Sequence, residues 1–271
     1  MKSLIQKFKL RGKFKYVFFK FHLYIFFPSY ILLFFGHMNK LSKWINKHKK
    51  NENCDSLKWK FDYEKREGMF ENIIKSQNLN NNIDYIEFGV CQGGSFQWWI
   101  NHIDHKDAKF YGFDTFTGLP EDWGSFKKGE MSNGNTPPVI DDNRHTFYQG
   151  LFQQTLIPFL GSVDLSRRKI LHMDADLYSS TLYVLTLMTP YLKSGDIIFF
   201  DEFNVPMHEF KAFSEWTESF YIEYEVLGSV NNFYQTAIHL KLSKNVSLLV
   251  KKKQKFYFLN KILKKAHNKY L

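Results

Sequence analysis

Acidic residues lie at the ends of four apolar runs, each of which is expected to be a strand of one sheet. The acids are Glu87, Asp114, Asp174, Asp176, Asp201 and Glu202. Carboxylates that share one edge of a sheet repel one another unless a cation or a proton lies between them. Two kinds of cation suit such an edge, a positively charged cofactor and a metal ion.

A metal site is one interpretation of the later acids. Asp174, Asp201 and Glu202 come from two runs that are one crossover apart, and carboxylate oxygens are the ligands that Mg²⁺ prefers. Asp176 lies on the same strand face as Asp174 and is the candidate general base for an acceptor hydroxyl. The alternative is that these acids only cap helices, because Asp201-Glu202 precedes one.

A cofactor site is the interpretation of the earlier acids. The stretch Ile83–Ser95 predicts a buried strand, a glycine turn with Gly89 and Gly93, and a helix that begins near Ser95. Asp114 follows Gly93 by 21 residues, the distance at which an acid accepts hydrogen bonds from a ribose. This spacing also fits a nicotinamide dinucleotide.

The form of the turn separates these cofactors. It is Gly-x-x-x-Gly-Gly rather than Gly-x-Gly-x-x-Gly, and it starts just after Glu87. A carboxylate there disfavours a pyrophosphate and favours a cationic cofactor without phosphate, such as S-adenosylmethionine. A glycine turn with no ligand is the structural alternative.

The elements that must position these residues alternate between strand and helix. The expected strands are 83–90, 110–116, 145–149, 168–176, 196–203, 224–230 and 236–241. The expected helices are 62–77, 96–100, 152–160, 179–192 and 207–220, and residues 117–144 are expected to form a long functional loop. The pattern predicts an α/β fold: a Rossmann-like, mostly parallel, seven-stranded sheet with helices on both faces and a C-terminal hairpin.

The charge of the 271-residue chain divides it into a body and two arms. Residues 1–50 hold 12 Lys/Arg and residues 241–271 hold 10, and neither segment contains Asp or Glu. The body therefore carries all 27 acids against the remaining 15 Lys/Arg, which argues against a nucleic-acid partner. Two cysteines, Cys54 and Cys91, form neither a disulfide framework nor a metal motif, so a cytoplasmic setting is expected.

The two arms are rich in aromatic residues and lysine. Residues 1–50 predict a segment that lies on an anionic membrane surface, and residues 242–271 predict a basic amphipathic tail with the same role. Alternatively, the first arm covers the body or pairs two subunits, and the second is a solvated tail. A spanning helix is disfavoured because Lys20 and His22 interrupt the apolar run, and no cleavage site for a signal peptide follows it.

Four motifs over residues 83–241 resemble the class I S-adenosylmethionine-dependent methyltransferases, and specifically the macrocin O-methyltransferase family. They are Glu-Phe-Gly-Val-Cys-Gln-Gly-Gly-Ser at 87–95, Tyr-Gly-Phe-Asp-Thr-Phe-Thr-Gly-Leu-Pro at 111–120, His-Met-Asp-Ala-Asp-Leu-Tyr-Ser-Ser-Thr at 172–181 and Phe-Asp-Glu-Phe at 200–203.

The resemblance implies methyl transfer to a hydroxyl, often on a sugar or glycoconjugate, with help from Mg²⁺. The implied cofactor-binding residues are Glu87, Gly89, Gly93, Ser95 and Asp114. The implied metal ligands are Asp174, Asp201 and Glu202, where the family carries Asp-Asp in place of Asp201-Glu202, and the implied base is Asp176.

Two other functions fit the same residues. One is a nicotinamide-dependent oxidoreductase on the same scaffold, and the other is a non-enzymatic, membrane-associated adaptor whose arms carry the function.

Overall fold

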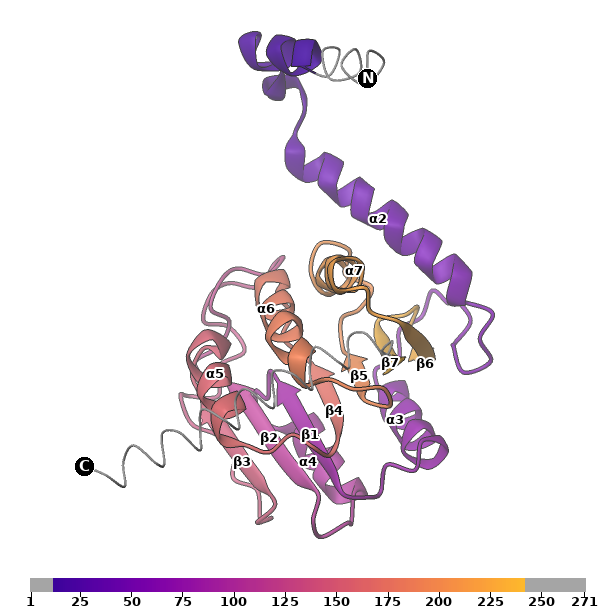
Figure 1. Ribbon diagram of the computed structural model, residues 1–271, viewed down its shortest axis with the longest axis vertical. Helices are drawn as coiled ribbons and strands as arrows, with labels where there is room; N and C mark the ends of the chain where they lie inside the picture. Colours follow the sequence, from indigo (N-terminus) through magenta and orange to yellow (C-terminus); the bar gives the residue numbers. More distant parts are fainter. Residues whose placement is uncertain (1–11, 242–271) are drawn as a thin grey trace, which may run out of the picture.

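The computed structural model describes residues 12–241, in which strands and helices alternate (Figure 1). The strands are β1 (Ile83–Phe88), β2 (Lys109–Asp114), β3 (His145–Gln149), β4 (Arg168–Met173), β5 (Ile197–Phe200), β6 (Tyr224–Val230) and β7 (Gln235–Leu240). The helices are α2 (Ser29–His48), α3 (Lys65–Ser76), α4 (Gly94–His102), α5 (Phe152–Ser162), α6 (Tyr178–Met188) and α7 (Glu209–Phe220), with short 3₁₀ turns η1 (Leu23–Phe26) and η2 (Thr189–Tyr191).

All seven strands form one sheet in the order β3-β2-β1-β4-β5-β7-β6. Strands β1 to β5 run parallel, and β7 pairs antiparallel with both β5 and β6. The predicted Rossmann-like, mostly parallel sheet with a C-terminal hairpin is therefore confirmed. The strand order reverses between β1 and β4, and ligands bind such sheets at the carboxyl ends of the strands beside that reversal.

Two apolar layers hold the helices on the two faces of the sheet. Successive side chains of β1 point to opposite faces, so Ile83 and Tyr85 join α3 and α4, while Ile86 and Phe88 join α5, α6 and α7. The whole of β1 is buried, as expected for the centre of a parallel sheet covered on both faces. This rigid centre fixes the position of the glycine turn that follows it.

The segment between β2 and β3 contains no helix or strand of its own, in agreement with the expected long loop 117–144. The loop folds back over the carboxyl edge of the sheet. Several backbone hydrogen bonds order it, among them those from the N–H groups of Asn133 and Asn135 to the carbonyl of Phe116. It can therefore contribute fixed side chains to a site at that edge.

The predicted N-terminal arm divides into two parts. Helix α2 packs on the body from its middle onward, where His37 and Leu41 are buried, so part of the predicted arm 1–50 lies against the body. Residues 12–20 are helical, and together with η1 and the start of α2 they stand away from the sheet (Figure 1). Between residues 12 and 241, no helix is long and apolar enough to cross a membrane. The predicted C-terminal tail, residues 242–271, lies outside the described residues.

Candidate active site

A cavity of about 350 Å³ opens at the carboxyl edge of the sheet, next to the reversal in strand order. Its lining comes from the segments that follow β1, β2, β3 and β4, and from the long loop. Gly89, Asp114, Asp174 and Asp176 are among the lining residues. The volume lies within the range of sites for small molecules and cofactors. The edge chosen from the sequence therefore carries a cavity.

The glycine turn brings two strand ends close together. Gly89 has a φ of +99°, and a Cβ atom at this position would lie 1.7 Å from the carbonyl oxygen of Asp174. Gly93 has a φ of +83° and sits against Pro138 of the long loop. Only glycine allows this backbone geometry without strain. Gly89 thus leaves bare backbone at the cavity, while Gly93 serves the turn and does not line the cavity.

Asp114 ties the glycine turn to the second strand. Its Oδ2 accepts a hydrogen bond from the N–H of Cys91 at 2.7 Å, and its Oδ1 accepts one from the N–H of Phe116 at 2.6 Å. A carboxylate has about four acceptor positions, so the carboxylate can still accept hydrogen bonds from a ligand. Among the predicted cofactor-binding residues, Asp114 and Gly89 lie at the cavity.

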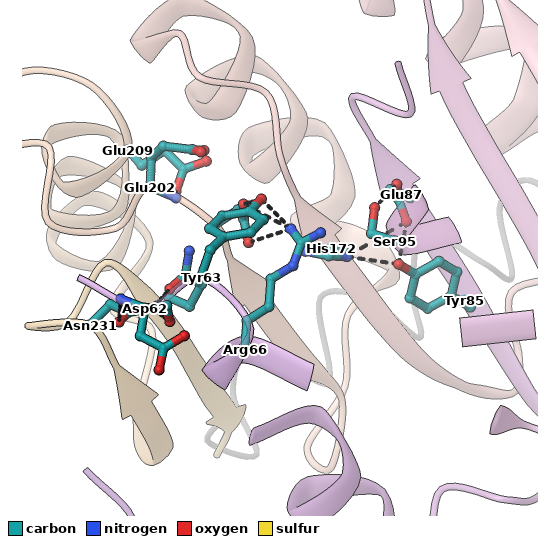
Figure 2. Close-up of polar contacts among 12 residues, drawn as sticks. Asp62, Tyr63, Arg66, Tyr85, Glu87, Ser95, His172, Glu202, Glu209 and Asn231 are labelled. Atoms are coloured by element: carbon teal, nitrogen blue, oxygen red, sulfur yellow. Dashed lines mark hydrogen bonds and ion pairs between the residues drawn. The ribbon is translucent and has the colours of Figure 1, made fainter. Parts of the chain in front are cut away.

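Glu87 lies in a buried polar group behind the cavity instead. Its Oε1 accepts a hydrogen bond from the hydroxyl of Ser95 at 2.8 Å, and its Oε2 accepts one from the hydroxyl of Tyr85 (Figure 2). The Tyr85 hydroxyl is also 2.7 Å from Nδ1 of His172, which faces Glu87 across the β1–β4 pair. The structure therefore places Glu87 and Ser95 where they support the wall of the cavity, not in its lining.

Three carboxylates converge beside the cavity. One oxygen each of Asp174, Asp176 and Glu202 can be chosen so that all three lie within 4.8 Å of one another. Oε2 of Glu202 is buried and has no hydrogen-bond partner. Asp176 has a φ of +57°, a left-handed conformation that Asp adopts more readily than most residues. This group of three differs by one member from the predicted metal ligands Asp174, Asp201 and Glu202.

Asp201 points toward a different partner, which explains the difference. Its Oδ2 accepts a hydrogen bond from the Tyr63 hydroxyl at 2.8 Å and pairs with the Arg66 guanidinium at 3.2 Å. Arg66 in turn lies over the Tyr63 ring, with 4.1 Å from its Cζ to the ring centroid (Figure 2). Asp201 is thus neutralised by an arginine, and Asp176 takes its place in the group of three.

Glu209 is a further acid near the edge of the sheet. It is fully buried at the start of α7, and its Oε2 accepts the N–H of Glu202 at 3.0 Å, whereas its Oε1 has no partner. The sequence reasoning missed Glu209, Arg66 and Tyr63. One feature of the sequence could have indicated Arg66: it is one of few cations in an acidic body, and it lies on the helix directly before β1.

The crowding of acids raises their proton affinity. Burial, together with the charges of Asp201 and Asp114, raises the pKa of Asp176 to about 7, although a hydrogen bond with Glu202 acts in the opposite direction. Burial raises the pKa of Asp174, Glu202 and Glu209 well above the usual range, and neighbouring carboxylates add to each shift. Among the described residues, too few cations lie at this edge to balance its carboxylates, so the carboxyl groups hold their protons more tightly.

Comparisons with known proteins agree with this geometry. Residues 86–203 match the protein family described as "Methyltransferase domain". The solved structure of CalS11, a calicheamicin methyltransferase, is 17% identical over 75% of this chain and 91% of its own, with a TM-score of 0.53. The O-methyltransferase NovP is 20% identical over 67% of this chain and 79% of its own, with a TM-score of 0.48. No curated protein sequence matches the chain.

These findings indicate the class of protein that this chain resembles. Residues 86–203 match a methyltransferase domain, and the sheet around them shares its fold with CalS11. The resemblance inferred from the four motifs is confirmed at this level. The comparisons do not single out the macrocin O-methyltransferase family. The family match favours methyl transfer over the nicotinamide-dependent and adaptor alternatives.

Proposed function

We propose that this protein transfers a methyl group from S-adenosylmethionine to a hydroxyl oxygen, the activity of an O-methyltransferase (EC 2.1.1). One observation carries the proposal: a single cavity is lined both by Gly89 and Asp114 and by the carboxylates of Asp174 and Asp176. The first pair suits a nucleoside, and the second pair suits a reacting hydroxyl. The methyl donor supplies an activated methyl group on a positively charged sulfur.

Asp114 is the residue we assign to the ribose. Its two backbone hydrogen bonds fix the carboxylate, so its remaining acceptor positions can face the hydroxyls of a nucleoside in the cavity. Gly89 lets the end of β1 approach the carbonyl of Asp174, and its backbone lines the cavity in which the donor would lie. The acidic surroundings favour a ligand with positive charge over one with a pyrophosphate.

Asp176 is the residue we assign as general base. It lines the cavity, and its pKa of about 7 is close to the pH at which a base works most efficiently. In its charged form the carboxylate takes the proton of the acceptor hydroxyl as the oxygen bonds to the methyl carbon. The carbon–sulfur bond breaks with its electron pair left on sulfur, so the positive charge disappears.

The group of Asp174, Asp176 and Glu202 fits a hard divalent cation such as Mg²⁺. The three oxygens lie within 4.8 Å of one another, and the unpartnered Oε2 of Glu202 supplies a ligand atom that now has nothing to bind. A bound cation would lower the pKa of the acceptor hydroxyl. Asp176 has two oxygens, so it can contact a cation with one and accept the proton with the other.

The acceptor that best suits the mouth of the cavity is a sugar or glycoconjugate. Ser179 and Ser180 line the cavity beside the acids, and the Ser179 hydroxyl donates to Glu121 of the long loop at 2.7 Å. These hydroxyl and carboxylate groups can form hydrogen bonds with the hydroxyls of a sugar in place of the bond that they make to each other.

The test is transfer of a labelled methyl group from S-adenosylmethionine to a panel of nucleotide sugars and free glycosides, with Mg²⁺ or with EDTA. We expect an O-methylated sugar and one S-adenosylhomocysteine per product, with a reduced rate in EDTA. Transfer only to non-sugar hydroxyls, or an unchanged rate in EDTA, would contradict the sugar or the metal part of the proposal.

A further inference from the structure

The part of the N-terminal arm that stands away from the body exposes many large apolar side chains. We call residues 12–35 the N-terminal platform. Its exposed members include Phe14, Tyr16, Phe19, Phe21, Tyr24, Ile25, Phe26, Tyr30, Ile31, Leu32, Leu33 and Phe35. Phe26 keeps 75% of its surface exposed and Phe35 keeps 65%. A contiguous apolar surface of this kind marks an interaction site.

The platform is held at a defined position by the other half of α2. Trp44 packs its ring 4.7 Å from that of Phe203 and donates its Nε1–H to the Tyr224 hydroxyl at 2.7 Å. Leu41 is buried one turn earlier, and Lys40 pairs with Glu218 of α7 at 3.3 Å. Helix α2 is therefore a stem anchored on the body, and its first turns carry the platform outward (Figure 1).

The charge of this region selects the kind of partner. Lys13, Lys15 and Lys20 lie within the platform, and no Asp or Glu occurs before Glu52. The Nζ of Lys20 lies 5.4 Å from the ring centroid of Tyr16, so aromatic and cationic groups alternate on one surface. Aromatic side chains with flanking lysines fit the headgroup layer of an anionic bilayer, where lysine stems extend to the lipid phosphates.

The length of the projecting turns of α2 suits insertion into one leaflet of a membrane. Residues 29–35 are the apolar, projecting turns of α2, and seven helical residues rise about 10 Å. An interfacial helix buries about 5–10 Å, whereas a spanning helix must cross about 30 Å of hydrocarbon.

We propose that the N-terminal platform docks the protein on an anionic membrane surface and that α2 holds the active-site edge beside it. Tyr30 and Phe34 of α2 also line a cleft with Trp123 and Phe126 of the long loop, and this loop carries Glu121 into the active-site cavity. Docking thus brings the acceptor side of the cavity toward the lipid surface. The docking rests on the arm alone, whereas the orientation of the acceptor side rests on the proposed function.

The experiment is flotation of the full chain with vesicles of phosphatidylcholine containing 30% phosphatidylglycerol, compared with vesicles of phosphatidylcholine alone. We expect flotation with the anionic vesicles that weakens in 0.5 M NaCl. The triple variant Phe19→Ser, Phe26→Ser, Phe35→Ser should bind at least tenfold more weakly, because three aromatic side chains no longer enter the interface. The matched control replaces three exposed apolar side chains of the body, Val139, Ile157 and Tyr221, by serine and should bind like the wild type.

Folding and cofactor binding are followed in the same samples through thermal unfolding and titration with S-adenosylhomocysteine. Both should be unchanged in the platform variant, so loss of flotation there cannot come from misfolding. Absence of flotation with the wild type, or equal flotation of the platform variant, overturns the proposal. A third outcome also overturns the proposal. If the wild type does not bind vesicles but forms a dimer in light scattering, and the platform variant is a monomer, the platform binds a second copy of the chain.

Discussion

Two buried glutamates near the carboxyl edge of the sheet differ in what surrounds them. Glu87 in β1 has hydrogen-bond donors on both oxygens, from Ser95 and Tyr85. Glu202, directly after β5, has an unpartnered Oε2 and two aspartates as neighbours. A carboxylate with donors on both oxygens stabilises the fold, whereas a crowded carboxylate with one oxygen unpartnered costs stability and persists where chemistry needs it. We infer that the contrast separates acids that support the fold from acids that are available for the proposed chemistry.

The largest expected effect comes from the base. Asp176→Asn should lower the rate of methyl transfer about 100- to 10,000-fold, the range for loss of a general base. Asn tolerates the left-handed backbone at this position, so folding should persist. Steady-state kinetics measure the rate, and calorimetry should give an affinity for S-adenosylhomocysteine within about twofold of wild type.

The matched control for this variant is Asp122→Asn, which removes an exposed acid paired with Lys127 in the long loop. It should leave the rate unchanged. A rate in Asp176→Asn that is close to the wild-type rate would refute the assignment of the base.

The next effect tests the two glutamates directly. Glu87→Ala removes the acceptor for two buried hydroxyls, and we expect a loss of about 3 kcal/mol of unfolding free energy. For a domain of this size that lowers Tm by roughly 6–12 °C. Glu202→Gln removes a crowded acidic group and should leave Tm unchanged or raise it. Thermal unfolding measures both, and equal losses in the two variants would erase the contrast.

A smaller effect follows from the pH dependence of stability. The folded protein raises the pKa of Asp176 from 3.8 to about 7, so between these values it binds more protons than the unfolded chain. The free energy of unfolding therefore falls as pH rises from about 4 to about 7. Thermal unfolding in EDTA at pH 5.5 and pH 8 should show a lower Tm at the higher pH. Asp176→Asn should show a weaker fall, and an identical slope in both proteins would argue against the shifted carboxyl.

The smallest effect is the response to a divalent cation. Mg²⁺ at a concentration tenfold above its Kd stabilises by about 1.4 kcal/mol, or roughly 3–6 °C. The rise in Tm should be larger at pH 8 than at pH 5.5, because protons compete for the same oxygens. Glu202→Gln should reduce the rise, whereas the exposed-site variant Asp122→Asn should keep it. A rise that is equal in all three proteins points to binding elsewhere.

Much of the fold could be predicted from the sequence because its signals are local. The apolar run before Gly89 and the alternation of strand and helix predicted the sheet, and the distance from Gly93 to Asp114 predicted an acid at the cavity. The face of the sheet toward which each acidic side chain points was harder to predict. Tyr85 and Glu87 lie two residues apart and so share one face, and the packing of α4 on that face turned Glu87 away from the cavity.

The pairing of the acids could not be predicted because it depends on long-range contacts. Arg66 and Asp201 are 135 positions apart, and spacing within the chain gives no sign that α3 delivers this guanidinium to the end of β5. That one contact removed Asp201 from the expected group of metal ligands and left Asp176 beside Asp174. Glu209 was missed for the same reason, since its role depends on how α7 docks after β5.

Calorimetric titration with S-adenosylhomocysteine is the most direct test of the central claim, which is that the cavity at Gly89 and Asp114 binds the methyl donor. The wild type should bind one equivalent with micromolar affinity, Asp114→Ala should bind at least tenfold more weakly, and NAD⁺ should give no heat. Binding of NAD⁺ in place of S-adenosylhomocysteine, or no binding of either at millimolar concentration, would contradict the account.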